Sequence, residues 1–259
     1  MAPITDSRRT LIVEELSRSQ IVKVADLSDH FGISEVSIRR DLQYLEHLGL
    51  LRRVHGGAIS ISSAPSVVGM LTKMKLTGEH KEHIGRAAAE MIHNGDRLII
   101  DSGSTPLEVA RNINRNLLTS GNLTIITAYL PVVQELGHRP GIHLILLGGI
   151  YLPAYQVNVG PQTLDQLKGL HADKLFLGTD GISLSQGLTS ANLLEAEVSR
   201  AMVKAAAEVI VVCDSSKIDV ISLANIMPIA DITKLITDQD ASPEFVAHLK
   251  DYGIEVILV

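Results

Sequence analysis

Apolar residues in the first 60 positions recur at the three- and four-residue spacing of amphipathic helices. This spacing predicts helices over residues 6–19 and 22–31, and Gly32 supplies a stop after the second helix. A third helix follows, with Ser34 as its N-cap residue. We therefore expect a small helical domain over residues 1–60.

The third predicted helix has an apolar stripe, formed by Ile38, Leu42 and Leu45, and an opposite face that carries polar and basic residues. Two short extended segments around a Gly-Gly pair follow it and predict a basic hairpin. A short helix, a glycine-containing turn, a basic helix and a hairpin describe a winged helix-turn-helix, whose third helix enters the major groove of double-stranded DNA. The residues expected to contact DNA are Ser34, Glu35, Val36, Ser37, Arg39, Arg40, Gln43, Arg52, Arg53, His55, Gly56 and Gly57.

Either arginine pair, 39–40 or 52–53, is by itself more typical of solvated surface charge than of a DNA contact. The ordered combination of the two helices, the tight turn and the basic hairpin is what favours DNA binding.

Short apolar runs alternate with helical segments beyond residue 75, which predicts an α/β domain with a mainly parallel sheet. The predicted strands lie near residues 97–101, 123–127, 142–149, 174–181, 208–214, 234–237 and 254–259. The predicted helices lie near residues 79–95, 106–118, 131–138, 161–169, 193–207 and 242–253. A Gly-, Ser- and Pro-rich stretch separates the two parts, so we expect a linker over 61–75 and the α/β domain over 76–259.

The distribution of charge along the chain adds to this picture. The 259 residues carry 23 Lys+Arg and 29 Asp+Glu, a net charge of −6, yet the first 60 residues hold eight of each and are neutral. The acidic excess therefore belongs to the α/β domain and does not argue against DNA binding by the first domain.

A single cysteine, Cys213, excludes an intrachain disulfide and a multi-cysteine metal site. We assign no metal and no cofactor, and we expect His80 and His83 to lie on the surface. The chain has no apolar run long enough to span a bilayer and no apolar signal segment near its start, so we expect a cytoplasmic protein that does not contact a membrane.

Three predicted strands end in polar residues, and ligands of open α/β sheets bind at the carboxyl ends of the strands. Asp101 ends the first strand, and a turn with Ser102, Gly103, Ser104 and Thr105 leads into the next helix. Such a turn offers backbone N–H groups and a positive dipole end to an anion. Asp180 and Lys217 follow two other strands. Capping, turn formation and a solvated lysine explain each residue singly, but three such ends at one sheet edge favour a small anionic ligand.

The segment FGISEVSIRRDLQYLEHLGLLRRVHGGA, over residues 31–58, resembles the winged helix-turn-helix of DeoR-type bacterial repressors, apart from Ser37 where the family more often has Thr. Residues 75–259 resemble the sensor domain of the same family, through DSGST at 101–105, DKLFLG at 173–178, DG at 180–181, GLT at 187–189 and DSSK at 214–217.

The resemblance implies a fold similar to ribose-5-phosphate isomerase, a phosphorylated sugar as effector, and homo-oligomers. It also implies that residues 101–105 hold the phosphate with Lys217 assisting, that Asp180 lies near the sugar, and that Lys81 and Glu197 belong to the site.

Two positions depart from the family pattern. Ala128 stands where the family usually has Asn, and Leu152 where it usually has Arg. We expect a somewhat different effector, with replacement hydrogen bonds from Tyr129, Tyr151, Tyr155 and Gln156. The expected function is a non-enzymatic, effector-modulated repressor of a sugar operon, with no catalytic residues. The alternatives are a sugar-phosphate isomerase with an appended DNA-binding domain, and a constitutive DNA-binding scaffold.

Overall fold

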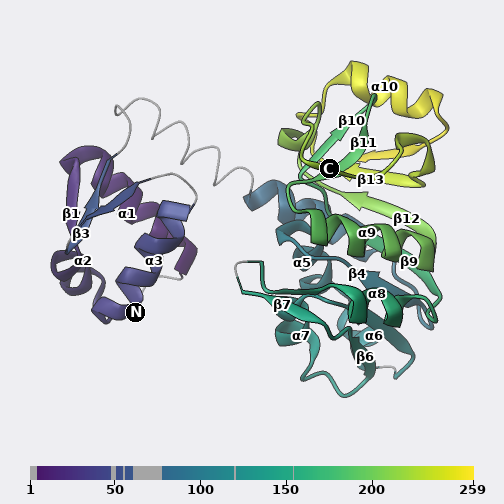
Figure 1. Ribbon diagram of the computed structural model, residues 1–259, viewed down its shortest axis with the longest axis horizontal. Helices are drawn as coiled ribbons and strands as arrows, with labels where there is room; N and C mark the ends of the chain where they lie inside the picture. The colour runs from purple at the N-terminus through teal and green to yellow at the C-terminus, as the bar shows by residue number, and fades with distance from the viewer. Residues whose placement is uncertain (1–4, 48–50, 55, 61–77, 120, 154) are drawn as a thin grey trace. The chain divides into compact units, whose positions relative to one another are not determined.

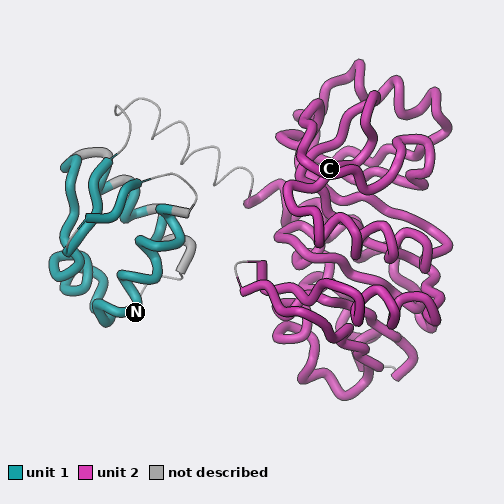
Figure 2. The backbone as a smooth tube through the Cα atoms, viewed as in Figure 1, with its two compact units in different colours: residues 1–77 teal, residues 78–259 magenta. Residues whose placement is uncertain are grey.

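The computed structural model describes the chain except for residues 1–4, 48–50, 55, 61–77, 120 and 154. The chain divides into two compact units, Met1–Thr77 and Gly78–Val259 (Figure 2). The linker expected over 61–75 lies outside the described residues.

The described residues of the smaller unit form three helices and a three-stranded sheet of order β1-β3-β2 (Figure 1). Its elements are α1 (Thr5–Ser19), β1 (Ile21–Lys23), α2 (Val24–Phe31), α3 (Glu35–His47), β2 (Arg52–Val54) and β3 (Gly57–Ile59). The helix expected over 22–31 begins only at Val24, because residues 21–23 are extended and pair with β3. The hairpin is thereby tied to the helical core through β1.

Helices α1 and α3 are joined by ionic contacts as well as by apolar packing. Ile38, Leu42 and Leu45 of α3 are fully buried, as the sequence pattern predicted. Beside them the Asp41 carboxylate, 2% exposed, accepts hydrogen bonds from Arg8 Nε at 2.7 Å and Arg9 Nε at 2.9 Å. These two arginines therefore hold α1 on the inner side of α3.

We predict that Asp41→Asn lowers the stability of the smaller unit by about 2–4 kcal/mol, because the amide leaves two largely buried guanidinium groups without a carboxylate. Hydrogen exchange of the full chain, followed peptide by peptide in urea, would be faster than in the wild type in α1 and α3. Exchange in the larger unit would not change. Asp29→Asn, an exposed carboxylate on α2, is the matched control. Equal protection in the two variants would contradict the prediction.

The larger unit is built on a seven-stranded sheet of order β15-β14-β12-β9-β4-β5-β6 (Figure 1). Every pairing in it is parallel, which confirms the expected α/β class. The strands are β4 (Arg97–Ile100), β5 (Leu123–Thr127), β6 (Ile142–Leu146), β9 (Ala172–Leu177), β12 (Ala206–Val212), β14 (Lys234–Thr237) and β15 (Glu255–Leu258). The helices are residues 78–89, α5 (Ser104–Arg111), α6 (Arg115–Thr119), α7 (Leu130–Leu136), α8 (Pro161–Leu167), α9 (Leu193–Ala205) and α10 (Pro243–Asp251).

Each face of the sheet has its own apolar core, because neighbouring residues of a strand point to opposite faces. Leu98 and Ile100 of β4 belong to one core, together with residues of helix 78–89, α5 and α7. Ile99 belongs to the other, together with residues of α8, α9 and α10. The strands are thus buried on both sides, which explains their nearly continuous apolar sequences.

The strand order reverses between β4 and β9. The chain runs outward from β4 through β5 to β6, returns to β9 on the other side of β4, and continues outward through β12, β14 and β15. The loops after β4 and β9 therefore leave adjacent strands in opposite directions, which opens a crevice at the carboxyl edge of an α/β sheet.

Some smaller elements are absent from the sequence pattern. A hairpin of β7 (Ile150–Leu152) and β8 (Val157–Val159), and a small sheet of β10 (Gly181–Ser183), β11 (Gly187–Ser190) and β13 (Ala224–Met227), occupy segments where, apart from Gly181, no helix or strand was expected. The helix expected over 106–118 is two helices, because the Asn114 side chain accepts from Asn116 N and starts α6. The helix expected over 79–95 ends at residue 89.

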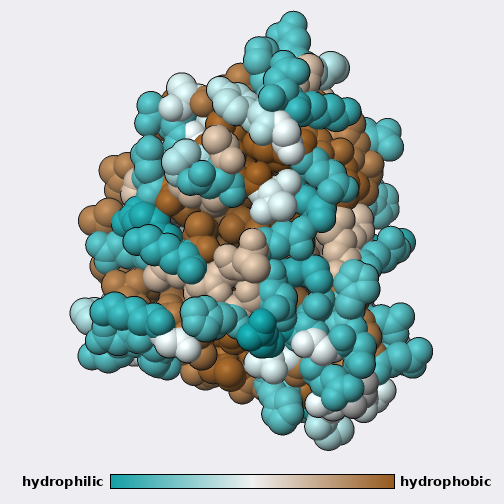
Figure 3. Space-filling model, turned by 90° about the vertical axis from the view of Figure 1, so that its right-hand side faces the viewer, coloured by the Kyte–Doolittle hydropathy of each residue, from teal (hydrophilic) through white to brown (hydrophobic). Residues whose placement is uncertain are grey.

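Within the described residues, no helix is long and apolar enough to cross a membrane. On the face drawn in Figure 3, hydrophobic residues lie between hydrophilic ones, as is usual for a folded surface.

Candidate functional site

Five of the twelve residues expected to contact DNA are exposed on α3, namely Glu35, Val36, Arg39, Arg40 and Gln43. The Ser34 hydroxyl accepts from Ser37 N at 3.3 Å and so caps the helix. Val36 is 56% exposed, and Glu35 pairs with Arg39 one turn further on. Arg40 and Gln43 are exposed on the same helix. Asp41 faces the opposite way, into the core.

The hairpin of β2 and β3 forms the wing. Arg52 and Arg53 are exposed, and Arg53 N donates to Glu46 Oε1 at 2.7 Å, which fixes the hairpin to the end of α3. Gly56 has a positive φ of 79°. Gly57 is buried, and a Cβ there would lie 2.1 Å from Val22 O on β1. The need for glycine at position 57 is therefore explained by its close packing against β1. His55 lies outside the described residues.

The loop after β4 brings bare backbone to the point where the strand order reverses. Gly103, with φ 119°, is the N-cap residue of α5 and has no side chain with which to cap it. Ser104 is exposed and Thr105 is buried in the first turn. A Cβ on Gly178, after β9, would lie 3.0 Å from Ser102 O. The two loops approach closely because residue 178 is glycine.

Three carboxyl groups gather beside this loop. Ser102 Oγ donates to Glu195 Oε1 at 3.3 Å, and Asp180 accepts from Ala191 N at 2.8 Å. Burial raises the pKa of Asp101 to about 7, and the negative charges of Glu195 and Asp180 add to this effect against backbone hydrogen bonds that oppose it. Burial likewise raises the pKa of Glu195 to about 7, with Asp180 adding to it.

Two lysines lie on the β12 side of the same edge. Lys81 Nζ, from helix 78–89, is 3.8 Å from Asp214 Oδ2, and no hydrogen bond within the described part of the chain reaches this buried oxygen. Burial lowers the pKa of Lys81, the Asp214 carboxylate opposes this, and the positive charge of Lys217 lowers it further. Helix 78–89 also touches α5, since a Cβ on Gly85 would lie 2.5 Å from Glu108 Cβ.

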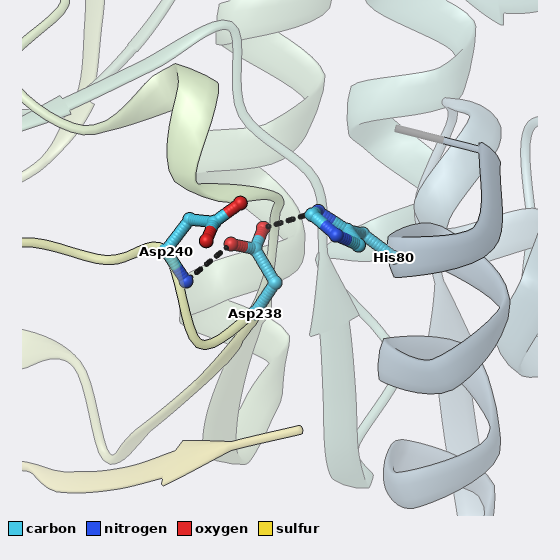
Figure 4. Close-up of side chains that lie close together, drawn as sticks. All are labelled: His80, Asp238 and Asp240. Atoms are coloured by element: carbon cyan, nitrogen blue, oxygen red, sulfur yellow. Dashed lines mark hydrogen bonds and ion pairs between the residues drawn. The ribbon is translucent and has the colours of Figure 1, made fainter. Parts of the chain in front are cut away.

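His80, which the sequence placed on the surface, instead contacts a buried carboxylate (Figure 4). Its Nδ1 is 3.4 Å from Asp238 Oδ2, and its side chain is 26% exposed. A ring nitrogen of His80 and one carboxylate oxygen each of Asp238 and Asp240 lie within 4.8 Å of one another. Both oxygens of Asp238 also accept backbone N–H groups, from Ser215 and Asp240. The arrangement is a capped turn after β14 that His80 ties to helix 78–89.

Glu195 is the site residue that sequence reasoning passed over. It stands three residues after Asn192, whose side chain accepts from the backbone N–H of Leu194 and Glu195, so in the sequence it is typical of a helix start. Glu197 lies two positions further along α9, about 200° around the helix from Glu195, and is half-buried. The structure brings Glu195, and not Glu197, to the Ser102 hydroxyl.

Ala128 and Leu152, the two residues that differ from the family pattern, lie near or within the β7–β8 hairpin. Ala128 is fully buried, and its carbonyl accepts from Asn158 N at 2.9 Å. Leu152 packs against the core. Tyr129 is half-buried after β5, and the other residues expected to supply replacement hydrogen bonds are exposed, namely Tyr151, Tyr155 and Gln156.

The raised pKa of Glu195 makes stability depend on pH. A carboxyl group whose pKa is higher in the folded chain retains its proton there, so its contribution to stability is greatest below the ordinary pKa of 4.5 and is lost as pH rises through about 7. We predict that Glu195→Gln gains stability relative to the wild type between pH 5 and pH 8, by about 1 kcal/mol after allowance for solvent screening.

Thermal unfolding at pH 5, 6.5 and 8 measures this difference. Glu244→Gln, at an exposed first-turn position of α10, is the control and should show no trend. A difference between Glu195→Gln and the wild type that is the same at every pH would rule the prediction out.

Comparison with known protein families covers both units. Residues 8–64 match the DeoR-like helix-turn-helix domain, and residues 77–239 match the DeoR C-terminal sensor domain. Transcriptional repressor AccR of Agrobacterium fabrum is 34% identical over 235 residues, 90% of each chain. The glycerol-3-phosphate regulon repressor of Escherichia coli is 32% identical over 251 residues, 97% of this chain and 98% of that protein.

Solved structures show a more distant likeness. Ribose 5-phosphate isomerase from Plasmodium falciparum aligns with 54% of this chain and 53% of its own, at 20% identity and a TM-score of 0.41. The translation initiation factor eIF-2B from Pyrococcus horikoshii aligns with 91% of this chain and 90% of its own, at 15% identity and a TM-score of 0.48.

Proposed function

The chain belongs to the DeoR family of helix-turn-helix transcriptional regulators, and on that premise we propose that it represses a carbohydrate catabolic operon under the control of a phosphorylated sugar. The smaller unit binds operator DNA, and the sugar phosphate binds at the carboxyl edge of the large sheet and modulates operator affinity. The regulator acts as a homo-oligomer, since helix-turn-helix proteins read two half-sites with two copies.

The exposed basic surface of α3 and the wing supports the DNA-binding half. Arg40 is exposed on α3 and Arg52 on the wing, while Arg8 and Arg9 are engaged by Asp41. An arginine on a recognition helix can bind a guanine edge bidentately, whereas one on a wing suits a phosphate.

We predict that Arg40→Ala weakens binding to the DNA sequence that the protein selects from a random library by about 1–3 kcal/mol, and weakens binding to scrambled DNA less. Fluorescence anisotropy at fixed salt measures both affinities. Arg115→Ala, an exposed arginine on α6, is the control. An equal loss on both DNA sequences would assign Arg40 to the phosphate backbone instead of to a base.

One observation supports the proposed binding of a sugar phosphate: Lys81, Lys217 and the start of α5 lie at the carboxyl edge of the sheet. The first-turn N–H groups of α5 and two ammonium groups provide the donors that a phosphate dianion needs. The acidic excess of the chain makes such a ligand depend on these local donors.

Gel-shift titration with a panel of hexose, pentose and triose phosphates tests this half directly. We predict that at least one of them changes operator affinity, and that Lys217→Gln weakens its binding about tenfold, as the loss of a charge-assisted contact implies. Lys250→Gln, an exposed lysine on α10, is the control. If no phosphosugar shifts operator affinity, the proposed control by a ligand fails, although DNA binding would stand.

Helix 78–89 offers a route between the ligand and the DNA-binding unit. It is the first described segment of the larger unit, and its first turn contacts the carboxyl edge at two points, His80 with Asp238 and Lys81 with Asp214. A phosphate that draws Lys81 away from Asp214 acts on the helix that the linker enters. The ligand changes operator affinity only to the extent that it binds the two arrangements unequally.

A sugar-phosphate isomerase remains the second candidate, because carboxyl groups with a pKa near 7 suit general acid–base chemistry. The relatives are named as regulators and repressors, which favours the first candidate. Turnover of ribose 5-phosphate that Asp180→Asn abolishes would favour the enzyme.

A further inference from the structure

The seven-stranded sheet of the larger unit ends in two edge strands, β6 and β15 (Figure 1). An edge strand presents backbone groups that no neighbouring strand takes up, and native sheets prevent unwanted pairing there with charged side chains, proline or a covering segment. The two edges differ in this respect. β15 carries Glu255, whose carboxylate lies 3.5 Å from Lys234 Nζ, whereas β6, with the sequence IHLIL, has no Asp, Glu, Lys or Arg.

The hydrogen bonds between β5 and β6 show which backbone groups of β6 face outward. Leu147 N, one residue beyond β6, donates to Thr127 O of β5. Successive residues of a strand direct their N–H and C=O groups to alternate sides. The groups of Ile142, Leu144 and Leu146 therefore point away from β5, and among the described residues no hydrogen bond from outside the sheet reaches them.

Two apolar side chains of β6 are exposed beside these outward groups. Leu146 is 41% exposed and Ile145 is 36% exposed. They lie on opposite faces of the sheet, because they are neighbours in one strand. An uncharged edge strand that exposes apolar side chains on both faces favours pairing with another strand.

A second copy of β6 matches this edge in its backbone and in its side chains. Antiparallel pairing about a two-fold axis at Leu144 places Leu144 opposite its counterpart and Ile142 opposite Leu146, so that the outward N–H and C=O groups of all three residues are paired. The exposed Leu146 then packs against Ile142 of the second copy on one face, and Ile145 packs against His143 on the other.

Symmetry and charge favour this occupant over the other edge of the same sheet. The contact between two β6 strands brings no charged side chain of either strand into the interface. It also closes on itself, whereas pairing of β6 with β15 would continue from copy to copy and produce a filament.

We propose that two copies of this chain associate through their β6 strands, in antiparallel register centred on Leu144, so that the two seven-stranded sheets form one continuous sheet. The proposal rests on the homo-oligomer of the proposed function and assigns its interface to a segment of the larger unit. The contact involves neither the DNA-binding unit nor the loops at the carboxyl edge.

A proline at an outward position blocks the pairing without opening the sheet of the single chain. Leu146→Pro removes an N–H that points away from β5, so the hydrogen bonds between β5 and β6 remain. Leu258→Pro is the matched control on the other edge, because Leu258 is 43% exposed on β15. Its N–H also points outward, since the next residue, Val259, is the one that donates to Thr237 O.

Sedimentation velocity of the full chain over a concentration series measures the dissociation constant of each variant. We expect Leu146→Pro to raise it on the order of tenfold to a hundredfold, because the two-fold axis removes each lost contact twice. Leu258→Pro should leave it unchanged. Leu146→Lys with Leu258→Lys forms a second matched pair in case proline disturbs folding, which circular dichroism would reveal.

A cysteine cross-link tests the register independently. In the proposed register His143 faces Ile145 of the second copy, with Cα atoms about 4.5 Å apart, which suits a disulfide. A one-to-one mixture of His143→Cys and Ile145→Cys chains should therefore yield a covalent dimer with one chain of each kind under mild oxidation, and either variant alone should yield much less. The wild type is the control, since its single cysteine, Cys213, is buried.

The outcomes separate the interface from the homo-oligomer itself. If the wild type is an oligomer that Leu146→Pro leaves unchanged, or that gives no mixed cross-link, the assignment to β6 is overturned and the homo-oligomer stands. An equal effect of Leu146→Pro and Leu258→Pro also overturns the assignment. If the wild type is a monomer with and without operator DNA, the homo-oligomer and its interface are both overturned.

Discussion

The parallel direction of all seven strands in the large sheet is the constraint on which the candidate ligand site depends. Parallel strands send every strand-to-helix loop to the same edge, so residues 101–105, 178–180 and 214–217 meet although more than 30 residues separate each from the next. The reversal of strand order between β4 and β9 then opens that edge at one point. Two glycines leave the backbone accessible at this point, because Gly103 starts α5 without a side chain and Gly178 lets the neighbouring loop approach.

In the smaller unit, the corresponding constraint is the contact of the Asp41 carboxylate with the guanidinium groups of Arg8 and Arg9. Asp41 pairs with both Arg8 and Arg9 at the α1–α3 contact, and Glu35 and Glu46 contact Arg39 and Arg53. The exposed charge of α3 and the wing is therefore set by a few positions instead of by the total number of basic residues. The basic face of α3 and the wing therefore depends on where the exposed arginines lie, namely Arg40 and Arg52, and not on a net positive charge of the domain.

The sequence predicted the strands of the large sheet well, because burial on both faces produces apolar runs that periodicity detects. It also placed Asp101, Asp180 and Lys217 at one edge, since the loops after parallel strands share that edge, whereas Lys81 was implied only by the family resemblance. It missed β1 and the β7–β8 hairpin, whose three-residue strands carry too few residues to show a period. It missed Glu195 because a glutamate three residues after a capping asparagine is explained locally, and only the tertiary contact with Ser102 distinguishes it.

His80 shows how a local signal can mislead in the opposite direction. Near the start of a helix, among charged residues, it was typical of the surface, yet it meets Asp238 from a strand end more than 150 residues away. Together with Lys81 it attaches the first turn of helix 78–89 to the carboxyl edge, where the proposed ligand would compete for the same ammonium group. Asp214 would then lose the ammonium group that lies 3.8 Å from its Oδ2. A ligand that bound Lys81 in this way would alter the contacts of the segment that follows the linker, which is the coupling that the proposed function requires.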